Sequence, residues 1–348
     1  MGTGEQRSRP GWLIGGLGVG LLAAVVVALG SGAVRIAPSN VVAILLGHAG
    51  LGDGGSGGPT ADAVLWSIRL PRVLLAVGVG AGLAVAGAAL QGIFRNPLAD
   101  PQLIGISSGA AAGSAIGVLL LEAAIGGIAA PIGAFAGGLA AGAAVYSLAR
   151  HRGRTEVVTL ILAGIAVAAV GGALAGFLSV IADDPRLGSP LFYSLGGLGV
   201  ATWRLVGVTL PIVAIGLLFL PREARRLDLI LLGEREAAHL GVDVEALRRR
   251  VLLLVTLTVG ATVAAAGVIG FVGLLVPHAI RLVAGPGHRV LLPASALGGA
   301  LLVVGADTVA RTVALPLEIP VGLLTALAGG PLFLWLLRRT RHEHGGWG

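Results

Sequence analysis

Long apolar stretches, separated by short segments that hold most of the prolines and charges, are the main pattern of this chain. A helix that crosses a bilayer needs about 20 mainly apolar residues, and ten stretches have roughly that length. The pattern therefore predicts an all-α polytopic membrane protein with about ten transmembrane helices, in a single domain of residues 1–348. The predicted helices cover residues 12–33, 73–94, 103–121, 125–149, 156–181, 203–221, 248–266, 268–284, 290–311 and 321–337.

One of these stretches occurs twice. Arg72–Ala88 has the sequence RVLLAVGVGAGLAVAGA, and Arg250–Ala266 has the sequence RVLLLVTLTVGATVAAA, with nine identical positions out of seventeen. Sequence rich in Gly, Ala, Val and Leu can match itself by chance. A repeat at half-chain spacing in a hydrophobic protein is nevertheless typical of transporters built from two related halves.

Composition excludes several classes of protein. Hydrophobic residues make up 55% of the chain and charged residues 12%, and the mean hydropathy is +0.94, values far from those of a soluble domain. The absence of cysteine excludes disulfides and iron–sulfur clusters. All 24 basic residues are arginine, and a conventional ATPase needs a lysine in its phosphate-binding loop. Any ATP that drives this protein is therefore hydrolysed by a partner.

The placement of the arginines predicts the topology. With the N-terminus in the cytoplasm, eighteen arginines fall on the cytoplasmic side and six outside, which is a strong positive-inside bias. The net charge of +7 thus reflects membrane orientation and not a nucleic-acid partner. Trp12–Leu29 is long for the apolar part of a signal peptide, so we expect a first transmembrane helix there. The two copies of the repeat then run in opposite directions, as inverted repeats with both chain termini cytoplasmic.

Three segments between the predicted helices carry polar residues. Gln91–Gly109 contains two prolines that interrupt a helix, although an ordinary turn remains an alternative. The cytoplasmic segment 222–247 contains a short predicted helix, Glu234–Leu240, which follows Gly233 and is ended by Gly241. Such a helix is a natural docking element for a motor subunit, and a solvated loop is the alternative. Asp183–Trp203 is expected to hold a broken helix at the outer mouth, including Phe192 and Tyr193.

These motifs resemble the iron-complex and cobalamin uptake permeases, the membrane subunits of type II ABC importers. The resemblance covers nearly the whole chain in several long motifs that occur in the same order. The motifs are RLPR (Arg69–Arg72), GAALQGIFRNPLADPQLIGISSGA (Gly87–Ala110), LILAG (Leu160–Gly164), GERE-A-HLG (Gly233–Gly241), GFVGLLVPHAIRL (Gly270–Leu282), HRVLLP (His288–Pro293), GADTVAR (Gly305–Arg311) and EIPVGLLTALAGGPLFLWLL (Glu318–Leu337).

The resemblance implies a homodimer in a bacterial cell (inner) membrane, with two cytoplasmic ATPase subunits and an extracytoplasmic binding protein. It also implies a role for individual residues. Arg69, Arg72 and Arg311 would dock the binding protein, with Asp307 orienting Arg311 from one turn earlier, although anchoring at the membrane interface would also explain these arginines. The implied coupling helix contains Gly233, Glu234, Ala237, Leu240 and Gly241, and the implied cytoplasmic gate contains Asn96, Pro97, Leu98, Val157 and Val158.

The substrate is expected to be haem or another iron complex, and the chain itself is expected to bind no cofactor and no metal. The segment Ala182–Trp203 is more similar to the haem permeases of the family than to its siderophore or cobalamin permeases, and both of these remain alternatives. An ion-coupled secondary transporter is the alternative from another class, but it would need carboxylates within the membrane. Asp307 is the only acidic residue that lies inside a predicted span and not at its first position. A membrane enzyme would need converging His, Asp or Glu residues, and the sequence shows no such cluster.

Overall fold

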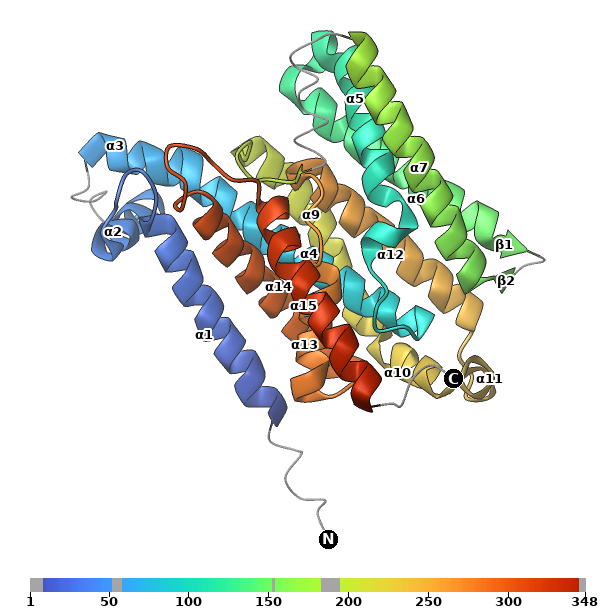
Figure 1. Cartoon of the computed structure of the whole chain (residues 1–348). Coiled ribbons are helices and arrows are strands. Elements are labelled where there is room, and N and C mark those ends of the chain that lie inside the picture. The colour runs from blue at the N-terminus through green and yellow to red at the C-terminus, as the bar shows by residue number, and fades with distance from the viewer. Residues whose placement is uncertain (1–8, 52–57, 152–153, 183–194, 344–348) are drawn as a thin grey trace.

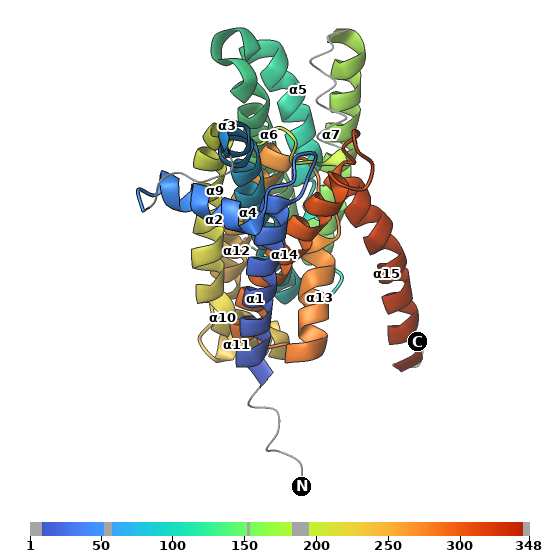
Figure 2. The ribbon, with the colours of Figure 1, turned by 90° about the vertical axis from the view of Figure 1, so that its left-hand side faces the viewer.

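The computed structural model describes residues 9–51, 58–151, 154–182 and 195–343. The chain forms a bundle of helices, shown from two directions in Figures 1 and 2. Figure 1 shows that α1 begins and α15 ends at the end of the bundle that carries α11, and that α2 and α3 lie at the opposite end. These are called the α11 end and the α2–α3 end below.

Each of the ten predicted spans corresponds to a helix. Within the described residues, seven helical stretches are long and apolar enough to cross a membrane. One of them, Ile106–Ala149, contains both α5 and α6, and two shorter apolar helices account for the other two predicted spans. The helices are α1 (Arg9–Gly30), α4 (Leu70–Phe94), α5 (Ile106–Ile125), α6 (Ala129–Ala149), α7 (Val157–Ala182), α9 (Trp203–Phe219), α12 (Val244–Ala266), α13 (Val272–Ala284), α14 (His288–Ala310) and α15 (Val321–Glu343).

Some predicted helix ends were wrong. The first helix ends at Gly30 and not at residue 33, and the eighth begins at Val272 and not at residue 268. In the second case Gly267 has φ +66° and Phe271 also has a positive φ, a left-handed conformation that a continuing helix cannot contain. The seventh helix begins four residues earlier than predicted because the Asp243 side chain caps it, accepting from the Ala246 N–H at 2.9 Å.

Several short elements were not predicted. Helices α2 (Pro38–His48) and α3 (Gly58–Ala63) and the π-helix Val64–Arg69 precede α4. The two-residue strands β1 (Arg150–His151) and β2 (Arg154–Thr155) pair between α6 and α7, and α10 (Ala224–Leu232) precedes α11 (Glu234–His239). The described part of the chain also contains the 3₁₀ turns Pro101–Ile104, Gly126–Ile128 and Leu220–Glu223.

Close backbone contact joins α5 to α6. The glycines Gly109, Gly113 and Gly117 recur every four residues on α5 and face Gly137, Gly133 and Ala129 on α6. A Cβ added at Gly113 would lie 2.2 Å from the carbonyl oxygen of Gly133, so these positions admit only a hydrogen atom. This small-residue spacing is typical of helices packed in lipid, where the backbones approach each other closely.

The repeat occupies the middle of the bundle. Its first copy is in α4, of which most residues from Pro71 to Ile93 are buried, and its second copy is in α12. The two helices contact each other and run in opposite directions (Figure 1). Helix α4 packs on α14 while α12 packs on α6. This arrangement agrees with the predicted inverted repeat.

Candidate functional site

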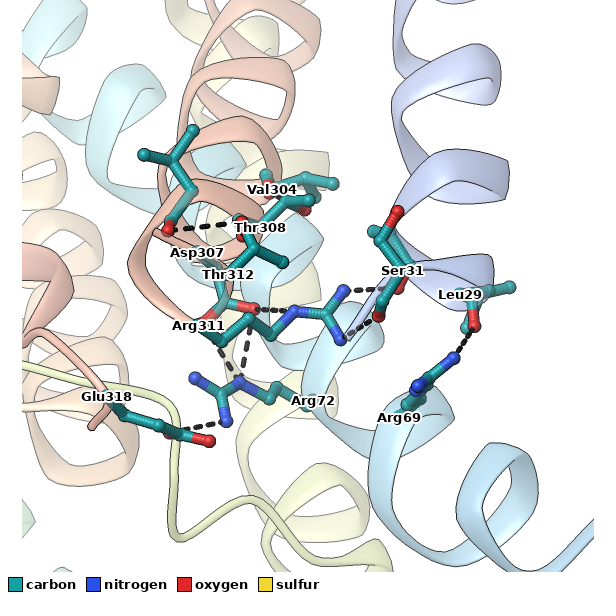
Figure 3. A network of polar contacts seen from close by, with 12 residues as sticks. Leu29, Ser31, Arg69, Arg72, Val304, Asp307, Thr308, Arg311, Thr312 and Glu318 are labelled. Carbon is teal, nitrogen blue, oxygen red and sulfur yellow. Dashed lines mark hydrogen bonds and ion pairs between the residues drawn. The ribbon is translucent and has the colours of Figure 1, made fainter. Parts of the chain in front are cut away.

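An ion pair joins α4 to α14 at the α2–α3 end (Figure 3). Arg72, in the first turn of α4, donates from Nε to both carboxylate oxygens of Asp307, at 3.0 and 3.1 Å. Its Nη1 donates to Glu318 at 2.8 Å. Arg72 and Asp307 are buried, whereas the Glu318 side chain is 51% exposed. The antiparallel packing of α4 on α14 thus brings together residues that lie 235 positions apart.

Two further arginines bind the backbone where α1 ends, as Figure 3 shows for part of the network. The last carbonyl groups of a helix lack partners within the helix, and a cation near them is favourable. Arg311 also contacts Asp307, with 3.6 Å between Nε and Oδ2, as the i,i+4 spacing predicted. The acceptors are the carbonyl oxygens of Leu29 (2.7 Å) and Val34 for Arg69, and of Ser31 (3.0 Å) and Ala28 for Arg311.

The structure therefore brings the three predicted docking arginines into one cluster, but as buried side chains. Arg69, Arg72 and Arg311 are 4%, 7% and 6% exposed, and they donate hydrogen bonds to carbonyl and carboxylate groups of the same chain. The exposed charge of the cluster is the carboxylate of Glu318. Docking of a partner on these arginines stays a prediction, and their visible role is to fasten α1, α4 and α14 to one another.

The predicted coupling helix is present as α11 at the opposite end (Figure 1). It is followed by Leu240 and then by Gly241, which has φ +83° and ends the helix in the left-handed conformation that was expected. Ala237 is fully buried and fixes the helix to the bundle, while Glu234 and Leu240 are exposed. The Leu240 side chain is 61% exposed, so this end of the bundle presents an apolar residue among charged ones.

The first predicted gate segment, Asn96–Leu98, lies directly after α4. Arg95 ends the helix with φ +51°, and the Asn96 Oδ1 then accepts from the Leu98 N–H at 2.9 Å, which closes a tight turn. Asp100 accepts from the Gln102 N–H at 2.8 Å. Burial raises the pKa of Asp100 to about 6, and the backbone hydrogen bond opposes this shift.

The second predicted gate segment, Val157–Val158, begins α7. Val157 is half-buried, and Val158 is 70% exposed. Thr155, the last residue of β2, is buried and lies two residues before Val157. A gating role for either segment is not tested by these contacts and stays a prediction.

The predicted outer-mouth residues Phe192 and Tyr193 lie outside the described residues. Within the described ranges, no group of three His, Asp or Glu residues is placed to hold a metal ion. An apolar cavity of about 400 Å³ lies between α13, α14, α15 and Leu17 of α1.

Sequence reasoning missed three polar residues that the structure places at helix contacts. Glu318 was quoted only as part of a motif, and two buried residues, Arg248 and His288, were given no role. Arg248 contacts α11 and His288 contacts α10. A charged residue that falls at the edge of an apolar span is a usable signal for such contacts, because an unpaired charge is costly there.

Comparison with known proteins agrees with this architecture. The model of the FecCD transport family matches residues 20–339. The chain is 48% identical to the hemin transport system permease protein HmuU of Yersinia pestis, over 82% of this chain and 87% of that protein. It is 46% identical to the cobalamin import system permease protein BtuC of Halobacterium salinarum, over 80% of this chain and 74% of that protein.

A solved structure matches as well. It is an inward-facing conformation of an ABC transporter assigned to the metal-chelate type, with a TM-score of 0.81 and 32% identity, and the match covers 94% of this chain and 99% of that one. The family match spans most of the chain, and both permeases exceed 45% identity over at least four fifths of it. The chain therefore belongs to the FecCD transport family and is a membrane-spanning permease subunit of an ABC importer.

Proposed function

We propose that this permease moves haem, or a similar iron complex, into the cytoplasm. The observation that carries the proposal is the 48% identity to a hemin transport permease over most of both chains. A large and mainly apolar ligand also suits a pathway between helices rich in Ala, Gly and Leu. The substrate passes through and leaves, so no tight iron ligand is required of this chain.

The proposed assembly is a homodimer in a bacterial inner membrane, with two ATPase subunits at the α11 end and a binding protein at the α2–α3 end. The α11 end then faces the cytoplasm, together with both chain termini. The exposed side chains of α11 support this assignment, because a protruding helix with Leu240 at its end can enter a cleft on a partner. ATP is hydrolysed on the partner subunits, and this chain is not an enzyme.

In this proposal, closure of the ATPases displaces α11, and the displacement opens or closes the two gate segments. Rigid-body rocking of packed helices around a central path is a known form of such a transition. At the other end, the Arg69, Arg72 and Arg311 cluster is the proposed docking site for carboxylates of the binding protein, since arginine pairs with carboxylates through two parallel hydrogen bonds.

Two alternative functions are separated by specific observations. The 46% identity to a cobalamin permease makes cobalamin the second candidate substrate, in the same type of importer. An ion-coupled secondary transporter needs a membrane carboxylate that can bind the coupling ion. The buried carboxylate of Asp307 is already paired with Arg72 and Arg311, which speaks against this second mechanism.

The test reconstitutes the permease with its ATPase and binding protein in proteoliposomes. ATP hydrolysis is measured with the binding protein empty, or loaded with haem, a ferric siderophore or cobalamin. We expect haem to stimulate hydrolysis and to accumulate in the vesicles. Stimulation by the siderophore or cobalamin alone would reject the haem assignment, and uptake by the permease without its ATPase, driven by a proton or sodium gradient, would reject the ABC mechanism.

A further inference from the structure

Helices α10 and α11 are joined by a single residue, Gly233, which has φ +136°. They therefore form one bent segment at the α11 end. Each of the two helices is fastened to the transmembrane bundle by a separate buried polar contact. One contact centres on Arg248 and the other on His288, and they lead toward different gate segments.

The Arg248 link, made of Glu234, Arg248, Glu245 and Thr155, connects α11 to the start of α7. Arg248 in α12 is 4% exposed. Its Nη2 donates to Glu234 of α11 at 2.6 Å, and its Nη1 donates to the carbonyl oxygen of Thr155 at 2.8 Å. Glu245 completes the link by accepting from the N–H of Thr155 at 3.1 Å and from its hydroxyl at 2.5 Å.

Thr155 lies two residues before Val157, so a single residue separates the Arg248 link from the second gate segment. Charge-assisted hydrogen bonds of this kind are short and geometrically specific. A buried arginine that loses its partners leaves an uncompensated charge. A displacement of α11 is therefore expected to carry Arg248 and Thr155 with it.

The His288 link, made of Asp228 and His288, connects α10 to the end of α4. The Asp228 Oδ1 accepts from the backbone N–H of His288 at 2.8 Å and lies 2.7 Å from its Nδ1. Because a carboxylate only accepts hydrogen bonds, Nδ1 is the ring nitrogen that carries the proton in this contact. The His288 ring is 1% exposed and packs against Gly92 in the last turn of α4, where an added Cβ would lie 2.6 Å from Nε2.

Gly92 lies three residues before Arg95, at which α4 ends and the first gate segment begins. The His288 link thus contacts α4 immediately before Asn96–Leu98. The cytoplasmic segment is therefore connected to both predicted gates, through two different helices and two different types of polar contact. Nothing in the spacing of the sequence shows this arrangement.

We propose that Arg248 and His288 are positioning residues that transmit one displacement of α10 and α11 to both gate segments at the same time. The proposal rests on the proposed function of α11 as the coupling helix. Simultaneous transmission would make the two gate segments move together. When the bent segment moves, α11 displaces the Arg248 link and α10 displaces the His288 link.

The first measurement uses the absence of cysteine in the chain, which allows spin labels to be placed on introduced cysteines alone. Labels at Arg235→Cys and Val158→Cys, two exposed positions, report the distance between α11 and the second gate segment in the whole complex with and without ATP. We expect this distance to stay constant in the otherwise native chain and to change on ATP binding when Arg248→Gln is present. Arg249→Gln, an exposed neighbour, is the matched control and should leave the distance constant.

The second measurement is the amount of substrate imported per ATP hydrolysed. We expect import per ATP to fall about tenfold for Arg248→Gln and for Asp228→Ala. Asp228→Ala breaks the His288 link at its partly exposed residue. Import per ATP should not change for Arg249→Gln or Arg289→Gln. If Arg248→Gln does not fold, Glu245→Gln weakens the same link from a partly exposed position. Unchanged import per ATP, or a parallel loss of hydrolysis and import, would overturn the proposal.

The distance measurement separates this proposal from the proposed function. If the native complex binds ATP but imports no iron complex, the substrate assignment fails. The link is still supported in that case if the label distance is constant in the native chain and changes with ATP in Arg248→Gln. A distance that changes with ATP in the native chain overturns the link even where haem is imported.

Discussion

Arg72 and Asp307 form a buried ion pair in which one guanidinium Nε donates to both carboxylate oxygens, at 3.0 and 3.1 Å. The pair joins the beginning of α4 to the end of α14. Since Asp307 also contacts Arg311, it faces two buried arginines, while the exposed Glu318 shares only one of them.

This unequal sharing predicts an order of stability loss. Asp307→Asn should cost the most, about 3–5 kcal/mol, because it leaves buried arginines without their common carboxylate. Arg72→Gln should cost less, and Glu318→Gln at most about 1 kcal/mol, because an exposed partner contributes little. Thermal unfolding of the purified chain in detergent, followed by tryptophan fluorescence, measures the order. Equal losses, or the largest loss for Glu318→Gln, would contradict the assigned geometry.

Charge reversal at Arg69 and Arg72 should weaken docking of an acidic binding protein, as the resemblance implied. Both side chains are buried, so the same variants should also lower the unfolding temperature, and binding must be compared in samples that remain folded.

Glu318→Gln offers a cleaner test of docking, because this exposed residue can change without opening the bundle. Removing its negative charge should strengthen the association severalfold at low salt and less at high salt. Surface plasmon resonance at two salt concentrations measures the effect. The control is Glu156→Gln, a change of an exposed residue at the α11 end of the bundle. Equal affinities for native chain and Glu318→Gln at both concentrations would remove the cluster from the docking site.

The contact between α5 and α6 predicts a strong effect of one methyl group. Gly113→Ala places a Cβ 2.2 Å from the Gly133 carbonyl oxygen, so the helices must separate, at a cost of about 1–3 kcal/mol or more. Gly172→Ala on α7, where nothing lies within 4 Å of the new Cβ, should be neutral or slightly stabilising. Gly113→Ala should therefore lower the midpoint of thermal unfolding, whereas Gly172→Ala should leave it unchanged or raise it slightly. Similar midpoints for the two variants would refute the close approach of α5 and α6.

Asp100 predicts a pH dependence of stability. Burial raises its pKa to about 6 from an ordinary value of 3.8, so the folded chain binds this proton more tightly than the unfolded chain does. The contribution of Asp100 to stability therefore increases as the pH falls from about 7 to about 4, and its charged form is unfavourable above that range.

Asp100→Asn keeps an acceptor for the Gln102 N–H and cannot ionise. The variant should be more stable than the native chain at pH 8, and the difference should shrink at pH 5. Comparing the two chains at each pH cancels the titration of other groups. A difference in unfolding temperature that is the same at both pH values would show that Asp100 is not the titrating group.

The sequence located the ten membrane helices because apolar length is a local property, and α5 and α14 were predicted within a few residues of their ends. The short helix after Gly233 and its termination at Gly241 were also predicted, since capping is local chemistry. The segment between α1 and α4 was not predicted, because α2, α3 and the π-helix are shorter than a membrane span and owe their positions to packing on the bundle.

The spacing of residues along the sequence could not predict which groups the side chains of the site bind. The sequence identified Arg69, Arg72 and Arg311, and it found the Arg311–Asp307 contact because those two residues are one turn apart. It placed the arginines toward an external partner, whereas the fold satisfies them internally with carbonyl groups of α1 and with Asp307. Contacts such as Asp228–His288 depend on which helices are neighbours, and only the assembled bundle defines that.

The four-residue glycine spacing of α5 also has a consequence for how this chain can diverge. At Gly109, Gly113 and Gly117 every substitution adds atoms where the backbone of α6 already lies, so selection should remove nearly all variants there. At Gly15, Gly16, Gly172 and Gly176 nothing lies within 4 Å of an added Cβ, and exchange with alanine should be almost neutral. Among descendants of one ancestor, glycines of the same chain should thus fall into a fixed class and a drifting class, which differ only in what lies opposite them.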